Sequence, residues 1–380
     1  MVRSWVRGLA AVPVVITLGL VSTIPSYAQR AGPTWQAVQT PSAQPPASLA
    51  DVEAQGVRSA WAVGSEGSPS IPLIVHWNGR RWVKQPSPGW QGTLTEVTTA
   101  PDGTWASGVD QTTGAAKLLR RIGSVWAPRG FPRSDDTTLR ITGLSALPGG
   151  RLWLSATYGS PTTSMLAFYD GRIWTETPLP VECATGCAVQ QVEARGPGDA
   201  WAVGTAAASS AAVATGIALR WDGTAWTARL PDGAGGVVSL NDVHAVSSGD
   251  VWAVGHKVVF NVPRPYSATV VLHYDGTSWQ DAGAPEVVGS GVSLAAGGDG
   301  LWVSVQLGAP GLAGTARYLR HASGMWTVVN GPAIPGADAV TTRAVAAVPG
   351  TSVTWSVGHR ASVAAQTTLP HIELSRPPVE

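Results

Sequence analysis

The pentapeptide Ala60-Trp61-Ala62-Val63-Gly64 returns as Ala200-Trp201-Ala202-Val203-Gly204 and, with one change, as Val251-Trp252-Ala253-Val254-Gly255. In the register that these segments set, four more tryptophans occupy the same place: Trp105, Trp153, Trp302 and Trp355. Neighbouring copies lie 44 to 53 residues apart. This is the period of a four-stranded propeller blade and is longer than a leucine-rich or tetratricopeptide repeat. Seven copies therefore predict seven blades.

Each copy has the same internal order of short apolar runs. A first run, such as residues 240–245, leads through a polar turn into the tryptophan strand, and a third run follows a loop of variable length. The third and fourth runs are joined at Asn78-Gly79, Asp170-Gly171, Asp222-Gly223 and Asp275-Gly276. These dipeptides favour a type I′ hairpin turn, in which both central residues have positive φ. We therefore expect four antiparallel strands in each blade.

The fourth strand carries a second tryptophan series with one member fewer: Trp82, Trp126, Trp174, Trp226, Trp279 and Trp326. The last third strand, residues 370–374, has no fourth strand after it, whereas Thr34-Trp35-Gln36-Ala37-Val38 matches the fourth-strand pattern. Pairing these two segments removes free sheet edges. The sequence thus predicts an all-β, seven-bladed β-propeller of four-stranded antiparallel blades whose last blade is closed by an N-terminal strand. Both tryptophan series are expected in its core.

The first 28 residues have the pattern of a secretory signal. Arg3 and Arg7 precede an apolar run at residues 9–21, and Ser26-Tyr27-Ala28 supplies small residues for cleavage. The run is shorter than the roughly 20 residues that a membrane-spanning helix needs. We expect a signal peptide at 1–28 and a secreted, extracellular mature chain, 29–380, that is one propeller domain without a membrane span.

Composition and charge restrict the partners. Charged residues make up 13% of the chain, the formal net charge is +1, and Trp outnumbers Phe by 18 to 3. This near-neutral charge does not predict binding to nucleic acid or to acidic lipid. Cys183 and Cys187 are the only cysteines, and in an exported chain they predict a local disulfide. Nothing near these cysteines completes a metal site, so we expect no metal there. We also expect a monomer without a cofactor.

The repeat also carries a family resemblance over nearly the whole mature chain. An Asp-x-Trp-Ala-Val-Gly strand followed by an aromatic-Asp-Gly-x-x-Trp hairpin, as in residues 221–226, resembles the repeats of secreted bacterial propellers and, more distantly, kelch repeats. The kelch double glycine is absent. The hairpin is also similar to the Asp-box of sialidases, although Trp221 or Tyr274 stands where that motif has Ser or Thr. The resemblance implies a propeller and brings no catalytic residues with it.

Loop lengths point to one face as the binding face. The turns between first and second strands and between third and fourth strands are short, whereas the second-to-third loops and the connections between blades vary. Binding residues gather on variable loops of a rigid scaffold. On this face we expect a non-catalytic interaction site for a glycan or a protein, and its candidate residues are Trp90, Tyr158, His256, Arg264, Tyr266, His359 and Arg360.

Two alternatives stay open. A carbohydrate-active hydrolase or lyase would draw its residues from several blades, and a sialidase-like carboxylate clamp would need Arg133, Arg264 and Arg343 to converge. Short catalytic motifs such as Gly-x-Ser-x-Gly are absent. Separately, Asp51, Glu96 and Asp242 recur in the first strands and could form a partial acidic ring for a cation in the central channel, although Gly143 and Gln191 take that place in two copies.

Overall fold

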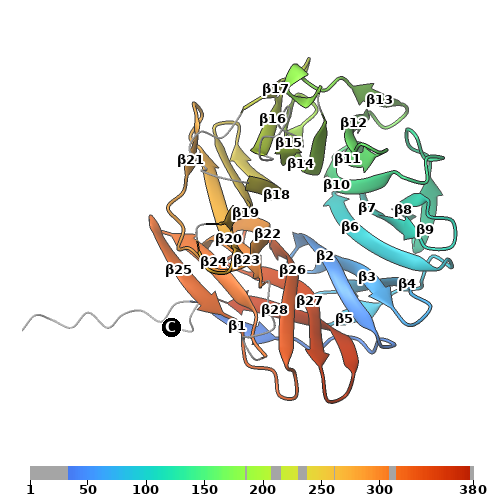
Figure 1. The fold of residues 1–380 in the computed structure, drawn as a ribbon. Helices are drawn as coiled ribbons and strands as arrows, with labels where there is room; N and C mark the ends of the chain where they lie inside the picture. The colour runs from blue at the N-terminus through green and yellow to red at the C-terminus, as the bar shows by residue number, and fades with distance from the viewer. Residues whose placement is uncertain are drawn as a thin grey trace, which may run out of the picture. The chain divides into compact units, whose positions relative to one another are not determined.

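The computed structural model describes residues 33–184, 186–206, 215–229, 238–260, 262–307 and 314–376. The expected signal peptide, residues 1–28, lies outside them. The described chain forms seven four-stranded antiparallel sheets, which are arranged radially as the blades of a propeller (Figure 1). A single 3₁₀ turn, η1 (Val181–Cys183), is the one helical element among these residues. Within the same residues no helix has the length and apolar character that crossing a bilayer requires.

Blades 1 to 4 follow one another in the chain, and each runs from its innermost to its outermost strand. Blade 1 contains β2 (Ala47–Gly56), β3 (Ser59–Glu66), β4 (Ile71–Trp77) and β5 (Trp82–Lys84), and blade 2 contains β6 (Gly92–Ala100), β7 (Gly103–Asp110), β8 (Ala116–Ile122) and β9 (Val125–Arg129). Blade 3 contains β10 (Arg140–Leu147), β11 (Arg151–Tyr158), β12 (Thr163–Tyr169) and β13 (Trp174–Thr177), and blade 4 contains β14 (Cys187–Gly196), β15 (Asp199–Ala206), β16 (Thr215–Trp221) and β17 (Trp226–Ala228).

Blades 5 to 7 continue the same order, except that the outermost strand of blade 7 comes from the other end of the chain. Blade 5 contains β18 (Val238–Ser247), β19 (Asp250–Val259), β20 (Tyr266–Tyr274) and β21 (Trp279–Asp281). Blade 6 contains β22 (Ser290–Gly297), β23 (Gly300–Gln306), β24 (Arg317–Ala322) and β25 (Met325–Asn330), and blade 7 contains β26 (Ala339–Ala347), β27 (Thr354–Ser362), β28 (Thr367–Arg376) and β1 (Thr34–Ala37).

The predicted closure of the ring is confirmed. β1 pairs antiparallel with β28, with Trp35 opposite Ser375 and Gln36 opposite Leu374, and the two strands lie side by side in Figure 1. The indole of Trp35 is 5% exposed and stacks on Tyr318 of blade 6, with ring centroids 4.1 Å apart. The first described strand therefore adds main-chain hydrogen bonds within blade 7 and an aromatic contact to blade 6.

The two tryptophan series meet between blades. At six of the seven junctions the second-strand Trp of one blade contacts the fourth-strand Trp of the next, with centroids 5.0 to 6.2 Å apart and rings tilted by 70° to 88°: Trp61–Trp126, Trp153–Trp226, Trp201–Trp279, Trp252–Trp326, Trp302–Trp35 and Trp355–Trp82. At the seventh, Trp105 contacts Tyr169, which packs on Trp174. Edge-to-face geometry suits the charge distribution of aromatic rings. The core prediction is confirmed, although Trp174, Trp252 and Trp326 are half-buried.

The predicted type I′ turns are wrong in detail. Only the glycine of each dipeptide has positive φ, for example 98° at Gly223, while the preceding Asp or Asn does not. Trp221 pairs with Trp226, so the loop contains four residues. Asp222 Oδ1 accepts hydrogen bonds from the N–H groups of Thr224 and Ala225 at 2.8 and 3.0 Å. The acidic side chain thus replaces a backbone acceptor in the turn, as Asn and Asp commonly do.

The predicted disulfide is confirmed. Cys183 and Cys187 are bonded, with their Cα atoms 5.0 Å apart, and both are buried. The bond joins η1 to the first residue of β14 and so fixes the connection that enters blade 4.

Candidate functional site

A β-bulge recurs in every innermost strand and shapes the central channel. In each blade an extra residue near the middle of the first strand interrupts its pairing with the second, and the first strands of blades 1, 4 and 5 have a further irregularity near their ends that is not counted among these seven bulges. A bulge re-aims the side chains that follow it. The residues directly after the seven bulges are Asp51, Glu96, Gly143, Gln191, Asp242, Ser293 and Ala344.

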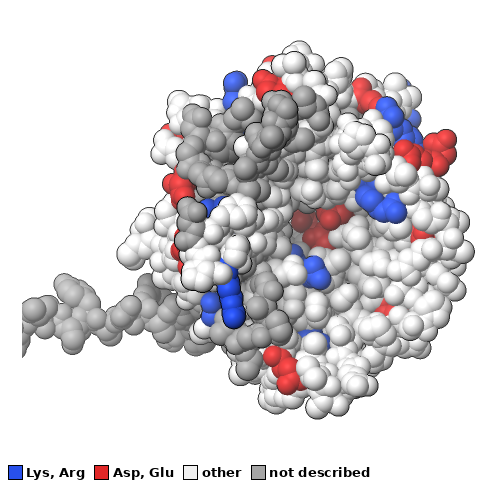
Figure 2. Space-filling view, in the orientation of Figure 1, with Lys and Arg blue, Asp and Glu red and all other residues white. Residues whose placement is uncertain are grey.

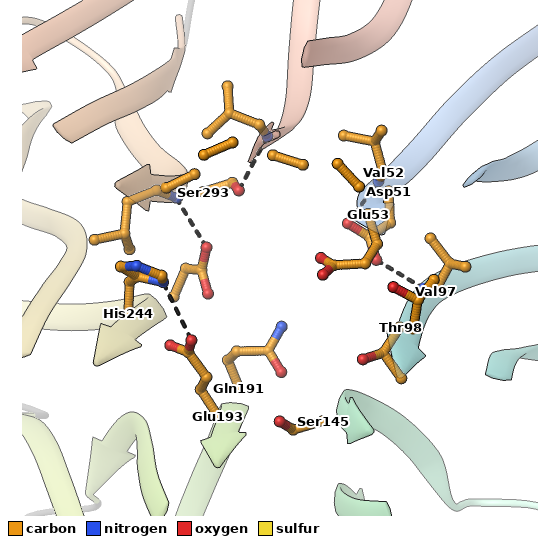
Figure 3. Close-up of a pocket in the computed structure, with 18 of the residues that line it drawn as sticks. Asp51, Val52, Glu53, Val97, Thr98, Ser145, Gln191, Glu193, His244 and Ser293 are labelled. Carbon is orange, nitrogen blue, oxygen red and sulfur yellow. Dashed lines mark hydrogen bonds and ion pairs between the residues drawn. The ribbon is translucent and has the colours of Figure 1, made fainter. Parts of the chain in front are cut away.

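The channel is hollow and acidic. A cavity of about 450 Å³ is lined by Asp51, Glu53, Glu96, Glu193 and Asp242 together with His244. Figure 2 shows acidic groups gathered in the hollow at the centre of the ring, and Figure 3 shows Glu53 of β2 and Gln191 and Glu193 of β14 reaching into the same space. A smaller cavity of about 200 Å³ meets it on the variable-loop side, with Arg343 among its lining residues.

Many of these polar side chains connect neighbouring blades. Asp51 Oδ2 accepts the N–H of Val97 at 2.7 Å, and Asp242 Oδ2 accepts the N–H of Leu294 at 2.9 Å. Equivalent bonds to the next blade are made by Thr98, Ser145, Glu193 and Ser293. Six junctions are bridged in this way. At the seventh, between blades 7 and 1, Ala344 and Ala346 occupy the corresponding positions, and the described residues make no such bond there.

Burial in the channel changes the protonation of its acids. It raises the pKa of Asp51 and of Asp242 to about 7, against hydrogen bonds from backbone N–H groups that lower them. Burial and the nearby Asp51 carboxylate raise the pKa of Glu53 to about 8. For His244, burial lowers the pKa, but Glu193, whose Oε1 lies 3.1 Å from Nδ1, outweighs it and brings the value to about 9. Asp51, Glu53, Asp242 and His244 therefore keep their protons to a higher pH in the channel than they would in water.

The predicted acidic ring has a structural use. Two of its three members, Asp51 and Asp242, accept two backbone N–H groups each, and Glu96 accepts a long hydrogen bond from Gln191 Nε2 at 3.4 Å. At the third blade Gly143 leaves room for the Gln191 side chain, whose terminal oxygen would have to move if a Cβ were added there. Among the described residues no three His, Cys, Asp or Glu side chains are arranged to hold a metal ion. The channel cation remains a hypothesis.

A second candidate site lies on the variable-loop face, between blades 5 and 6. This groove has a volume of about 400 Å³ and is lined by Asn241, Ser267, Gly289, Ser290, Val292, Gln306 and Leu307. These residues come from the bulges of β18 and β22, the beginnings of β20 and β22, and the end of β23. In antiparallel strands these positions lie at the same end of the blade, next to the variable second-to-third loops. The groove therefore lies on the face that the sequence predicted as the binding face.

A hydrogen-bond network stands behind the groove. Asn241 Nδ2 donates to Ser290 Oγ at 2.9 Å and to the carbonyl oxygen of Gly291 at 2.7 Å. Ser290 Oγ lies 3.1 Å from His256 Nδ1, and burial lowers the pKa of His256. On the same blade, the hydroxyl of Tyr266 donates to Glu286 Oε1 at 2.6 Å. Two predicted site residues, His256 and Tyr266, thus lie beside the groove.

The other candidates are dispersed. Trp90 packs against the core between blades 1 and 2, and its Nε1 is buried. Tyr158 lies under the guanidinium of Arg133, 4.6 Å from its ring centroid. His359 and Arg360 are half-buried on β27, and Arg264 is exposed in the loop between β19 and β20. The structure therefore does not bring these residues to one place.

The arginines of the sialidase-like alternative are also apart. Arg133 forms an ion pair with Glu176 on blade 3 at 3.1 Å, whereas Arg343 Nη1 donates to Gln306 Oε1 at 3.3 Å beside the channel mouth. Within the described chain no residue forms a hydrogen bond or an ion pair with two of Arg133, Arg264 and Arg343. This arrangement gives no support to a shared carboxylate clamp.

Sequence reasoning did not single out Asn241, Ser290 or Gln306. Asn241 occupies the bulge position of blade 5, where other blades have residues as different as Thr142 and Arg343. No spacing or motif marks such a position in a single sequence. The recurrent bulge itself would have been the signal, and it becomes visible only when the strand pairing is known.

Comparisons with known proteins agree on the architecture. No model of a known protein family matches the chain, and no curated protein does. Among solved structures, the one titled "YCF48 bound to D1 peptide" is 13% identical with a TM-score of 0.52, covering 92% of this chain and 100% of that one. The β-propeller domain of the Trilobed protease from Pyrococcus furiosus, with an open velcro topology, is 9% identical with a TM-score of 0.53, covering 88% and 98%.

A third similar structure is the extracellular domain of the putative hybrid two-component system BT4673 from B. thetaiotaomicron. It is 12% identical with a TM-score of 0.51, and the match covers 92% of this chain and 40% of that one. These likenesses show the fold alone. A propeller scaffold hosts unrelated functions, so the function has to be argued from the site.

Proposed function

We propose that this protein is a secreted, non-catalytic binding propeller that takes a glycan or a protein segment on its variable-loop face. The observation that carries the proposal is the groove between blades 5 and 6. Polar side chains from β18, β20, β22 and β23 converge there around a space of about 400 Å³. Concave sites of this size with a few convergent polar groups are the usual form of small-ligand sites.

Three further observations support the proposal. The signal-like N-terminal pattern and the Cys183–Cys187 disulfide both fit an oxidising compartment outside the cytosol. One similar propeller is bound to a peptide, which supports peptide recognition as one use of this architecture. The network of Asn241, Ser290 and His256 holds the groove wall in one arrangement, which lowers the entropy cost of binding.

The test is a binding screen with a groove variant. The purified full chain is applied to a glycan array and to a peptide array, and sugar release from the glycans is followed at the same time. We expect saturable binding of one ligand class, weakened in Gln306→Leu, because Gln306 lines the groove. Gln36→Leu is the matched control, since Gln36 is exposed on β1 in blade 7.

Two results would count against the proposal. Binding that is equally strong in Gln306→Leu would put the ligand elsewhere on the molecule. Release of free sugar by the wild type would show that the protein is an enzyme and would replace the non-catalytic assignment with the carbohydrate-active alternative.

A further inference from the structure

The groove between blades 5 and 6 has no charged side chain in its lining. Its polar members are two amides, Asn241 and Gln306, and two hydroxyls, Ser267 and Ser290, while Val292 and Leu307 supply apolar surface. Of the charged groups nearby, Glu286 binds both the hydroxyl of Tyr266 and, at 3.7 Å, the ammonium group of Lys257, whereas Arg343 donates to Gln306 Oε1 and has no carboxylate partner among the described residues. A ligand in this groove meets neutral donors and acceptors beside an apolar patch.

The network decides which atoms are left for a ligand. Both amide protons of Asn241 are used, on Ser290 Oγ and on the Gly291 carbonyl, so its Oδ1 is left as an acceptor. Since Ser290 Oγ accepts from Asn241, its own proton can donate to Nδ1 of His256, which burial keeps in the neutral form by lowering its pKa. Neutral His256 thereby fixes the Ser290 hydroxyl without bringing a charge to the groove.

Gln306 on blade 6 and Ser267 on blade 5 supply further polar groups. Gln306 Oε1 accepts a hydrogen bond from Arg343 Nη1 at 3.3 Å, which orients the amide so that Nε2, with its two protons, is the group left over. Ser267, on β20 of blade 5, contributes a hydroxyl without a hydrogen-bond partner among the described residues, and this hydroxyl can both donate and accept. The groove therefore offers an acceptor at Asn241 and a hydroxyl at Ser267 from blade 5, and a donor at Gln306 from blade 6.

We propose that this groove binds a neutral carbohydrate, with sugar hydroxyls on the Asn241, Ser267 and Gln306 side chains and a C–H face of the ring against Val292 and Leu307. The inference rests on the proposed binding function and gives it a ligand class. A hydroxyl donates and accepts at once, so it matches a wall of mixed neutral groups. The groove lining supplies no cation for the charge of an anionic sugar, because Arg343 is not part of the lining and donates to Gln306 Oε1, and an uncompensated charge is costly in a partly buried site.

The experiment measures binding by titration calorimetry with maltotetraose, cellotetraose and a mannotetraose as neutral probes, and with sialyllactose as an anionic probe. We expect saturable binding of a neutral probe. Ser267→Ala and Gln306→Leu should each weaken it by about 3- to 10-fold, the range that loss of one hydrogen bond gives. Both side chains lie outside the Asn241 network. Unchanged melting midpoints would confirm that these variants fold.

The remaining outcomes separate the two proposals. If sialyllactose or a peptide from the array binds, no neutral probe does, and Gln306→Leu weakens that binding, the binding function stands and the neutral-carbohydrate class is wrong. Loss of anionic binding in Arg343→Gln would point to the same correction. If no probe binds, or if binding is unaffected in Ser267→Ala and Gln306→Leu, the groove is not the site and both proposals fail.

Discussion

At the scale of the residue, the tryptophans do most to hold the blades together. Trp201 is fully buried, lies edge-on to Trp279 of the next blade at 5.6 Å and is covered by the guanidinium of Arg220 at 5.7 Å. Burial of one indole removes roughly 150 to 250 Å² from water. Each ring contacts two blades, so one side chain contributes both to the stability of its own sheet and to the attachment of its neighbour.

Replacing Trp201 by Ala should lower the free energy of unfolding by about 3 to 5 kcal/mol, because the cavity that it leaves between blades 4 and 5 can collapse only in part. Chemical denaturation followed by circular dichroism measures the change. The control is Ile173→Ala, which removes a side chain that is 65% exposed and should change stability by less than about 0.5 kcal/mol. Equal midpoints for Trp201→Ala and the wild type would refute the core role.

At the scale of the element, the short strand β1 determines whether the ring is closed. Its four residues pair with the end of β28, and Thr34 stands directly opposite Arg376. Both side chains are exposed and, as directly opposed residues of antiparallel strands, their Cβ atoms point to the same face of the sheet. This makes the pair a suitable place to test the closure by a covalent bond.

The double variant Thr34→Cys with Arg376→Cys should form an intramolecular disulfide under oxidising conditions, because directly opposed Cβ atoms are close enough for one. Mass spectrometry after proteolysis detects the bond. We expect its formation to raise the stability by up to about 3 kcal/mol, because it restricts the unfolded chain over a long loop. The control places the second cysteine at Thr367, at the other end of β28, and should not crosslink. Preferential crosslinking in the control would mean that β1 pairs in another register.

At the scale of the whole molecule, the channel collects acids that are distant in sequence. The pKa of Asp51 and Asp242 is raised to about 7 and that of Glu53 to about 8, in each case first by burial. The folded state therefore binds more protons than the unfolded state between about pH 4 and pH 8. Stability from these groups is fully present below their ordinary pKa values and is lost as the pH rises through the raised ones.

Glu53 provides the clearest test, because its carboxylate makes no hydrogen bond or ion pair with the described residues, whereas Asp51 and Asp242 also bridge blades. In Glu53→Gln, the free energy of unfolding should fall between about pH 5 and pH 8 by about 3 kcal/mol less than in the wild type. Urea unfolding across this range measures it. Glu182→Gln, at an exposed position on η1, is the control. A pH profile identical to that of the wild type would contradict the raised pKa.

The sequence by itself determined the seven blades, their four strands, the closure by residues 34–37 and the disulfide, because a blade is a local unit whose pattern is repeated in the chain. It also placed the two tryptophan series in the core, although Trp174, Trp252 and Trp326 are only half-buried there. Only the tertiary structure decided the four-residue hairpin loops, in which Asp222 binds the turn through its side chain, and the bulges that aim Asp51 and Asp242 along the channel. The groove of Asn241, Ser267, Ser290 and Gln306 is of the same kind. Its members are up to 65 residues apart and belong to different sheets, so their meeting depends on how two blades pack, and no local pattern in the chain records that.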